Sequence, residues 1–209
     1  MTSPLSSDEG PNPERATTPP PPAVEVIPLD PVPLLACEMA AANIQTILGL
    51  PAKVLPAWDQ PDYAYLPNRK QYDALPILKK LEIGRQRPSL RIAVTALDLC
   101  LPILTYVFGE ARIGGHLAVI SLFRLSRNPD GSRVPPSRLY ERLIKVVLHE
   151  TAHALGLEHC RVAGCLMNFS AGLEHLDALP LTFCPDCLRE LVVPTKTLVQ
   201  ETAQVWRNS

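Results

Sequence analysis

The spacing of apolar residues predicts strands that alternate with helices along the first half of the chain. Short apolar runs rich in β-branched residues are typical of buried strands, whereas apolar residues three and four positions apart line one face of a helix. The expected strands are 24–28, 52–56, 90–97 and 116–123. The expected helices are 34–48 and 69–83, each followed by a glycine suited to end a helix, although Pro76 disfavours an unbroken second helix.

Strands separated by helices favour a parallel βαβ arrangement, so we expect an α/β fold. Gly114 and Gly115 lie directly before the last expected strand, and they predict a tight return into an antiparallel or edge strand. An Asn-Pro-Asp-Gly turn follows at 128–131. The sheet should therefore be mixed.

A long helix is predicted in the second half, from 138 to about 155, with Ser137 as its N-cap after two prolines. This segment is apolar on more than one side, so we expect a central, buried helix. Beyond it the sequence becomes rich in loops and cysteines. A partly helical segment, 188–207, follows near the end of the chain.

The predicted long helix carries a motif with metal-binding spacing, H-E-x-x-H-x-x-G-x-x-H. It comprises His149, Glu150, His153, Gly156 and His159. Residues four apart share one face of a helix, so the first two histidines can bind the same zinc ion. On a continuous helix the third histidine would lie about 15 Å along the axis from the first. The chain must therefore turn back after the helix, and glycine favours that turn. The glutamate points elsewhere and can act as general base on a zinc-activated water.

An ordinary amphipathic helix with two surface histidines is the alternative explanation for the short form of this motif. H-E-x-x-H alone is expected by chance in about one such chain in 200. The added glycine and third histidine reduce this to about one in 10⁵. The full motif therefore indicates a catalytic zinc site.

Four cysteines follow in two short pairs, Cys160 with Cys165 and Cys184 with Cys187. Such pairs are typical of the two halves of a structural Cys₄ zinc site, in which four thiolates leave no position open for water. Two disulfides, or four unrelated buried thiols, are the alternatives. We expect two zinc ions per chain, one catalytic and one structural, with the second held within residues 160–187.

Composition and charge restrict the partners of the protein. The 209-residue chain has a formal net charge of -1, so it has no overall basic field that would favour nucleic acid. No apolar run suits a membrane span and the first residues lack the features of a signal peptide, so we expect an intracellular, cytoplasmic protein without a membrane partner. A run of arginines is interpreted as a solvated face rather than a nucleic-acid site. Its members are Arg124, Arg127, Arg133, Arg138 and Arg142.

The N-terminal segment differs in composition from the rest of the chain, because ten of the 23 prolines lie within the first 33 residues. Residues 1–22 combine proline, serine, threonine and charge. They cannot bury enough apolar surface to offset the entropy of ordering, so a disordered tail is expected there, with a binding site for a proline-recognising domain as the alternative. Residues 23–209 are expected to form a single domain, and no pattern indicates an oligomeric state.

In its histidine motif and its two cysteine pairs, the chain resembles the archaemetzincins, a branch of the metzincin zinc peptidases. The diagnostic part is the histidine motif followed directly by Cys160, then Cys165-Leu-Met167, then the C-x-x-C pair. The resemblance implies a twisted mixed sheet with backing helices, a central active-site helix and a loop-rich C-terminal part held by the Cys₄ zinc site. It also implies that Met167 forms an apolar floor beneath the histidines. Phe169 stands where some metzincins have a tyrosine that approaches the metal, so no phenol is offered there.

These features predict a zinc-dependent metallopeptidase that hydrolyses bonds of a peptide or protein substrate. The resemblance points to short peptides, with aminopeptidase activity as one form of this specificity. The expected strand 116–123 would pair with an extended substrate if it lies at the sheet edge. A zinc-stabilised binding protein with little or no turnover is the alternative, and Glu150 argues against it because a scaffold needs no base at that place.

Overall fold

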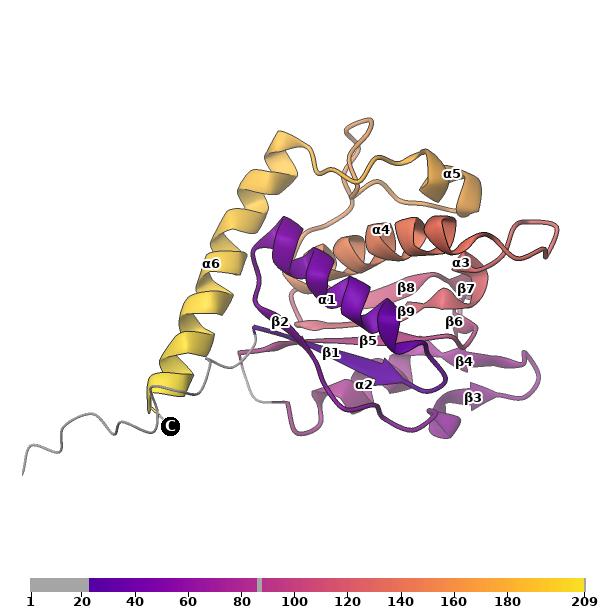
Figure 1. Ribbon diagram of the computed structural model, residues 1–209, viewed down its shortest axis with the longest axis horizontal. Helices are drawn as coiled ribbons and strands as arrows, with labels where there is room; N and C mark the ends of the chain where they lie inside the picture. Colours follow the sequence, from indigo (N-terminus) through magenta and orange to yellow (C-terminus); the bar gives the residue numbers. More distant parts are fainter. Residues whose placement is uncertain (1–22, 86–87, 209) are drawn as a thin grey trace, which may run out of the picture.

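The central sheet contains five strands in the order β2 (Ala52–Val54), β1 (Val24–Leu29), β5 (Leu90–Thr95), β9 (Leu117–Ser121) and β8 (Gly109–Arg112). The first four are parallel to one another, and β8 is antiparallel to β9. The computed structural model, shown in Figure 1, describes residues 23–85 and 88–208. The predicted disordered tail, 1–22, lies outside the described residues. The expected α/β class with a mixed sheet is confirmed.

The described residues form the helices α1 (Leu34–Leu48), α2 (Ala74–Glu82), α3 (Leu122–Leu125), α4 (Pro136–Ala154), α5 (Leu173–Ala178) and α6 (Pro185–Asn208). In Figure 1, α1 and α4 cover one face of the central sheet and α2 covers the other. Alternate side chains of β9 enter the two apolar cores on these faces. The predicted central helix is α4, and it is buried along most of its second half. None of the described helices is long and apolar enough to cross a membrane.

The return through Gly114 and Gly115 is confirmed, but the strand considered as a substrate-pairing edge is internal. Strand β9 pairs with β5 on one side and with β8 on the other. The free edge on this side of the sheet therefore belongs to β8. Its sequence, Gly-Glu-Ala-Arg, contains no β-branched or aromatic residue, so its strand character comes from pairing with β9 rather than from its own composition.

A second sheet that the sequence does not predict contains β3 (Tyr65–Leu66), β4 (Gln71–Asp73), β6 (Leu99–Leu101) and β7 (Leu104–Val107). Strands this short carry no readable periodicity. The helix predicted over 69–83 is consequently wrong in its first part, where β4 lies. Helix α2 begins after Asp73, whose carboxylate accepts a hydrogen bond from the Leu75 N–H at 3.0 Å. Pro76 is tolerated because it lies in the first turn, where backbone N–H groups have no helical acceptor.

Helix boundaries match the sequence at α1 and differ at α4. The range of α1 is the predicted one, and Gly49 ends it with φ 66° and an N–H bonded to the Gln45 carbonyl. The predicted N-cap of α4, Ser137, is wrong. The helix starts at Pro136 with Pro135 in the capping position and no side-chain cap. The fixed φ of proline suits the first helical position, so the proline pair replaces the serine as the start signal.

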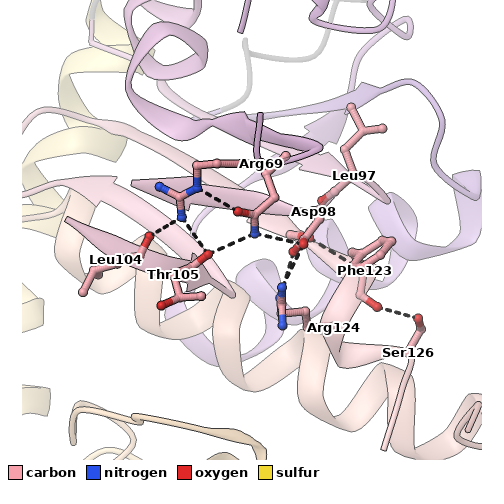
Figure 2. Close-up of polar contacts among 10 residues, drawn as sticks. Arg69, Leu97, Asp98, Leu104, Thr105, Phe123, Arg124 and Ser126 are labelled. Carbon is pink, nitrogen blue, oxygen red and sulfur yellow. Dashed lines mark hydrogen bonds and ion pairs between the residues drawn. The ribbon is translucent and has the colours of Figure 1, made fainter. Parts of the chain in front are cut away.

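A polar network shown in Figure 2 joins the second sheet to α3, the short helix that follows β9 directly. Arg69 donates to three backbone carbonyls of the β6–β7 hairpin at 2.6–2.9 Å. Gln71 donates to Asp98 at 2.9 Å and to the Thr105 carbonyl at 3.0 Å. Asp98 also accepts two hydrogen bonds from Arg124, at 2.8 and 2.9 Å. The network fixes β7, which leads directly into the edge strand β8.

Two buried cations on α4 hold α5 in place. Arg142, 2% exposed, donates to both carboxylate oxygens of Asp177 at 2.7 Å. It also donates to the carbonyls of Leu125, the last residue of α3, and of Arg127 just beyond it. Its guanidinium lowers the pKa of the Asp177 carboxyl. Lys145, also 2% exposed, donates to two carbonyls at the end of α5 and to Glu141. Both cations donate several hydrogen bonds to groups within the protein. These bonds offset the free-energy cost of burying a charge, which would be large for an unpaired cation.

Replacing Arg142 should therefore destabilise the protein strongly. In Arg142→Met, Asp177 and two backbone carbonyls lose their donors, and we expect the free energy of unfolding at pH 7 to fall by about 3 kcal/mol in urea titrations. The matched control is Arg133→Met, because Arg133 is exposed. That control should change stability by less than about 0.5 kcal/mol. Equal losses in the two variants would contradict the role given to Arg142.

Candidate active site

Three histidines on and just beyond α4 direct their ring nitrogens toward one another. The Nε2 atom of His153 lies 3.0 Å from that of His149 and 3.3 Å from that of His159. A tetrahedral zinc ion with bonds of about 2.1 Å would separate its nitrogen ligands by about 3.4 Å. The three side chains therefore have the spacing that one zinc ion requires.

The opposite ring nitrogens fix the tautomer of two of these histidines. The Nδ1 atom of His149 lies 2.8 Å from the Leu166 carbonyl, and that of His153 lies 2.6 Å from the Leu157 carbonyl. A carbonyl only accepts, so each Nδ1 must carry the proton. Burial lowers the pKa of His149 to about 4 and also lowers that of His153, so both rings are neutral at pH 7. Their Nε2 lone pairs are then free to bind a metal.

A turn after α4 brings His159 back to the helix. Gly156 has φ 111°, a backbone conformation that residues with side chains rarely adopt, and its N–H bonds the His153 carbonyl at 2.9 Å. The Leu157 N–H bonds the Ala152 carbonyl at 3.0 Å. The exposed ring of His159 then packs edge-on against Phe169, with centroids 5.4 Å apart. The reversal expected from the position of Gly156 is present.

Glu150 lies beside the histidines in a space that only a glycine on the edge strand leaves open. A Cβ atom on Gly109 of β8 would lie 2.7 Å from Cγ and 3.0 Å from Oε1 of Glu150. The glutamate is 8% exposed. Burial, together with the charge of Glu110, raises the pKa of Glu150 to about 8. A glycine at 109 is therefore needed for the carboxyl group to occupy its place.

These groups line a cavity of about 450 Å³. Its floor is α4, one wall is the edge strand β8 with the end of β7, and the other wall comes from α5 and the loop before it. In Figure 1 the segment that carries α5 lies above α4, on the side away from the sheet. The arrangement gives an extended molecule access to both the imidazoles and the Glu150 carboxyl.

The four paired cysteines gather into a second cluster. The Sγ atoms of Cys160 and Cys184 lie 3.8 Å apart, those of Cys165 and Cys187 lie 3.7 Å apart, and all four lie within 4.8 Å of one another. Disulfide sulfurs would be about 2.05 Å apart, whereas four sulfurs around one zinc ion are separated by about 3.8 Å. The N–H of Cys187 at the start of α6 lowers the pKa of Cys184 to about 7. The cluster has the composition and spacing of a Cys₄ zinc site.

Backbone hydrogen bonds connect the two clusters. The Cys160 N–H, next to His159 in sequence, bonds the Met167 carbonyl at 2.8 Å. Asn168 donates to the Cys160 carbonyl at 2.9 Å. Met167 is fully buried, and the carbonyl just before it orients His149. One short segment thus contacts both the sulfur cluster and a histidine of the imidazole cluster.

The sequence correctly predicted that three histidines would meet in one cluster and four cysteines in another. It did not identify the groups that orient the histidines. The carbonyls of Leu157 and Leu166 have no side-chain signature, so no sequence pattern could identify them. Gly109 had a weak signal, because an isolated glycine inside a strand often marks close approach of another group. Three arginines of the predicted solvated run, 124, 138 and 142, form ion pairs within the protein.

Sequence comparison supports the interpretation of these clusters. The model of peptidase family M54 matches residues 50–192, which include both clusters. The archaemetzincin of Archaeoglobus fulgidus is 35% identical over 157 residues, covering 74% of this chain and 89% of that protein. The archaemetzincin of Methanocaldococcus jannaschii is 37% identical over 141 residues, covering 66% of this chain and 76% of that protein.

Solved structures show the same fold. The crystal structure of archaemetzincin from Methanopyrus kandleri has a TM-score of 0.72 and 30% identity, covering 83% of this chain and 95% of that one. Archaemetzincin from Archaeoglobus fulgidus, crystallised with malonate, has a TM-score of 0.69 and 32% identity, covering 80% and 98%. Since the family match spans both clusters and the relatives share fold and sequence, the chain belongs to peptidase family M54, the archaemetzincins, and is a zinc metallopeptidase.

Proposed function

We propose that His149, His153 and His159 bind the catalytic zinc and that Glu150 is the general base. The observation that carries this assignment is the convergence of three Nε2 atoms in the cavity that also holds the Glu150 carboxyl. When bound, the zinc supplies a Lewis acid that activates water and polarises the scissile carbonyl. The carbonyls of Leu157 and Leu166 hold two of the imidazoles in the orientation and tautomer that metal binding needs.

Glu150 moves the proton in this mechanism. Burial and Glu110 favour its protonated form, whereas a divalent cation beside it favours the ionised form that can accept a proton. Glu150 takes a proton from the attacking water and later donates it to the leaving amine. Glu150 is only 8% exposed, which limits the contact of the carboxyl group with bulk water.

The edge strand β8 is the proposed binding element for the peptide backbone. It pairs with β9 on one side only, so its other side offers unpaired backbone groups along the cavity. An extended substrate would add as a further strand, antiparallel to β8, because antiparallel pairing is slightly more stable per residue. Short peptides, cleaved near the N-terminus, are the proposed substrates, and this finer specificity rests on the resemblance to the archaemetzincins.

We also propose that the four cysteines bind a second, structural zinc and that residues 23–209 form a single peptidase domain. Four thiolates fill a tetrahedral coordination sphere, so this ion has no position for substrate. Leu191 and Leu198 of α6 belong to the same apolar core as α1 and α4, which supports a single domain. Met167, buried beside the clusters, fits the proposed apolar floor beneath the histidines.

The first test of the base assignment is Glu150→Gln, which keeps the shape of the side chain but removes its basicity. We expect kcat to fall by about 10³-fold while the zinc content stays unchanged. The control is Glu190→Gln on the exposed surface of α6, which should retain full activity. Undiminished peptide hydrolysis by a zinc-loaded Glu150→Gln protein would rule out the assigned role.

A second test concerns the space beside the base. In Gly109→Ala, the new Cβ atom displaces the Glu150 side chain from its place. A misplacement of about 1 Å in a catalytic group can cost about 10²-fold, so we expect a loss in kcat of that order. Zinc content and melting temperature should remain close to those of the parent, because the displaced group is a flexible side chain. Parent-like kcat would show that the position of Glu150 is not limiting.

Metal analysis tests the proposed number of zinc ions. The purified parent should contain two per chain, with one lost in His153→Ala and the other in Cys187→Ser. The Cys187 variant should also lose about tenfold in activity, because the sulfur cluster positions the segment that orients His149. Cys100→Ala, outside both clusters, is the control and should keep both ions. A single zinc in the parent would refute the second site.

A further inference from the structure

A second cavity of about 410 Å³ adjoins the zinc cavity. The two share Tyr106 and Phe108, whose rings lie 5.5 Å apart at the start of the edge strand. Across from them Gly172 has no side chain, and a Cβ atom placed there would lie 4.0 Å from the Tyr106 hydroxyl oxygen. Tyr106 and Phe108 therefore line both cavities and mark the boundary between them.

The direction of the edge strand determines which part of a substrate reaches this second cavity. Tyr106 and Phe108 precede β8, so the cavity lies at the N-terminal end of that strand. A substrate antiparallel to β8 directs its C-terminal end toward the N-terminal end of β8. Residues that follow the scissile bond would therefore approach the second cavity.

The charged side chains around this cavity differ in whether they already have a partner within the protein. Arg124 lies over the Tyr106 ring, 4.1 Å from its centroid, and its charge is balanced by two hydrogen bonds to Asp98, as Figure 2 shows. Glu174 is exposed and also lines the cavity, where it opposes the binding of an anion. Asp130 is occupied by the backbone and side chain of Ser132.

Arg127 is the cation that remains available. Within the part of the chain that the structure describes, it has no carboxylate at ion-pairing distance, and its Nε is buried without a hydrogen-bond partner. Among the described residues, the one hydrogen bond of its guanidinium goes to the Gly131 carbonyl at 3.5 Å, beyond the usual range. The guanidinium lies over the Phe123 ring, 5.1 Å from the centroid, which holds it at the cavity wall. Five N–H donors are thus almost unused.

We propose that the second cavity is a substrate subsite in which Arg127 binds a carboxylate carried by residues on the leaving-amine side of the scissile bond. This inference rests on the proposed peptidase function. A guanidinium binds a carboxylate through two parallel hydrogen bonds, and the rings of Phe123 and Tyr106 offer apolar contact to the adjoining carbon atoms. The carboxylate can be the C-terminal one of a short peptide or the side chain of an aspartate or glutamate.

The experiment compares matched peptides on zinc-loaded protein. One pair differs in a free or amidated C-terminus, and a second set places glutamate or glutamine at each position after the scissile bond. In the parent we expect kcat/KM to be about tenfold higher for the peptide that carries the carboxylate in one of these pairs, mainly because its KM is lower. In Arg127→Gln the ratio should approach one, whereas in the exposed control Arg133→Gln it should stay at the parent value. The pair that responds identifies the source of the carboxylate.

Two further results separate this inference from the proposed function. If the parent cleaves peptides but shows no carboxylate preference, or if Arg127→Gln keeps the preference, the subsite is refuted and the peptidase function stands. If no peptide is cleaved, the same peptides are given a fluorescent label, and their binding to the protein is measured by fluorescence anisotropy instead. Carboxylate-selective binding that Arg127→Gln abolishes would then support the subsite while the peptidase function fails, and unselective binding would refute the subsite. Circular dichroism verifies that the variant is folded.

Discussion

The Nε2 lone pairs of His149 and His153, only 3.0 Å apart, repel one another unless a cation lies between them. The carbonyls of Leu157 and Leu166 require the proton on Nδ1 of His153 and His149, so neither of these two rings can relieve the repulsion by carrying its proton on Nε2. Most of the surrounding structure maintains this arrangement. A buried α4 fixes two of the rings, the turn at Gly156 returns the third, and the segment after Cys165 supplies one of the orienting carbonyls.

The cleft around these rings is assembled from segments that are distant in sequence. Its edge strand is fixed at one end by the Arg69–Asp98–Arg124 network, and its opposite wall is fixed by Arg142 and Lys145 on α4. Within the part of the chain that the structure describes, none of these cations donates a hydrogen bond to the three histidines. They set the width of the cleft, because each holds one wall to the helix or sheet beneath it.

The parts of this protein that were predictable from sequence are those where local spacing and tertiary contacts agree. Helix α1, strand β5 and the histidine motif belong to this class, because periodicity and ligand spacing are both local properties. The second sheet was not predictable in this way, since its strands are very short and β4 pairs with β6 across helix α2 and strand β5. The edge strand β8 was not predictable because its sequence, Gly-Glu-Ala-Arg, carries no strand signal of its own, although its partner β9 is close in the sequence. The same holds for Gly109, whose purpose depends on a carboxyl group of a different element. Arg142 was expected on a solvated face, but it is buried because its acceptors come from segments distant in sequence.

The sulfur cluster also closes a loop. Residues 166–183 leave the cluster at Cys165 and return to it at Cys184, and they include α5 and most of one wall of the cleft. A loop with both ends anchored at one place can change length at low entropic cost, about 0.6 kcal/mol for each doubling. Between Phe169 and α5, and between α5 and Cys184, this loop can therefore change length without removing the acceptors of Arg142 and Lys145 or the carbonyl that orients His149. The cleft can acquire a new shape on one side while its chemistry on the other side remains fixed.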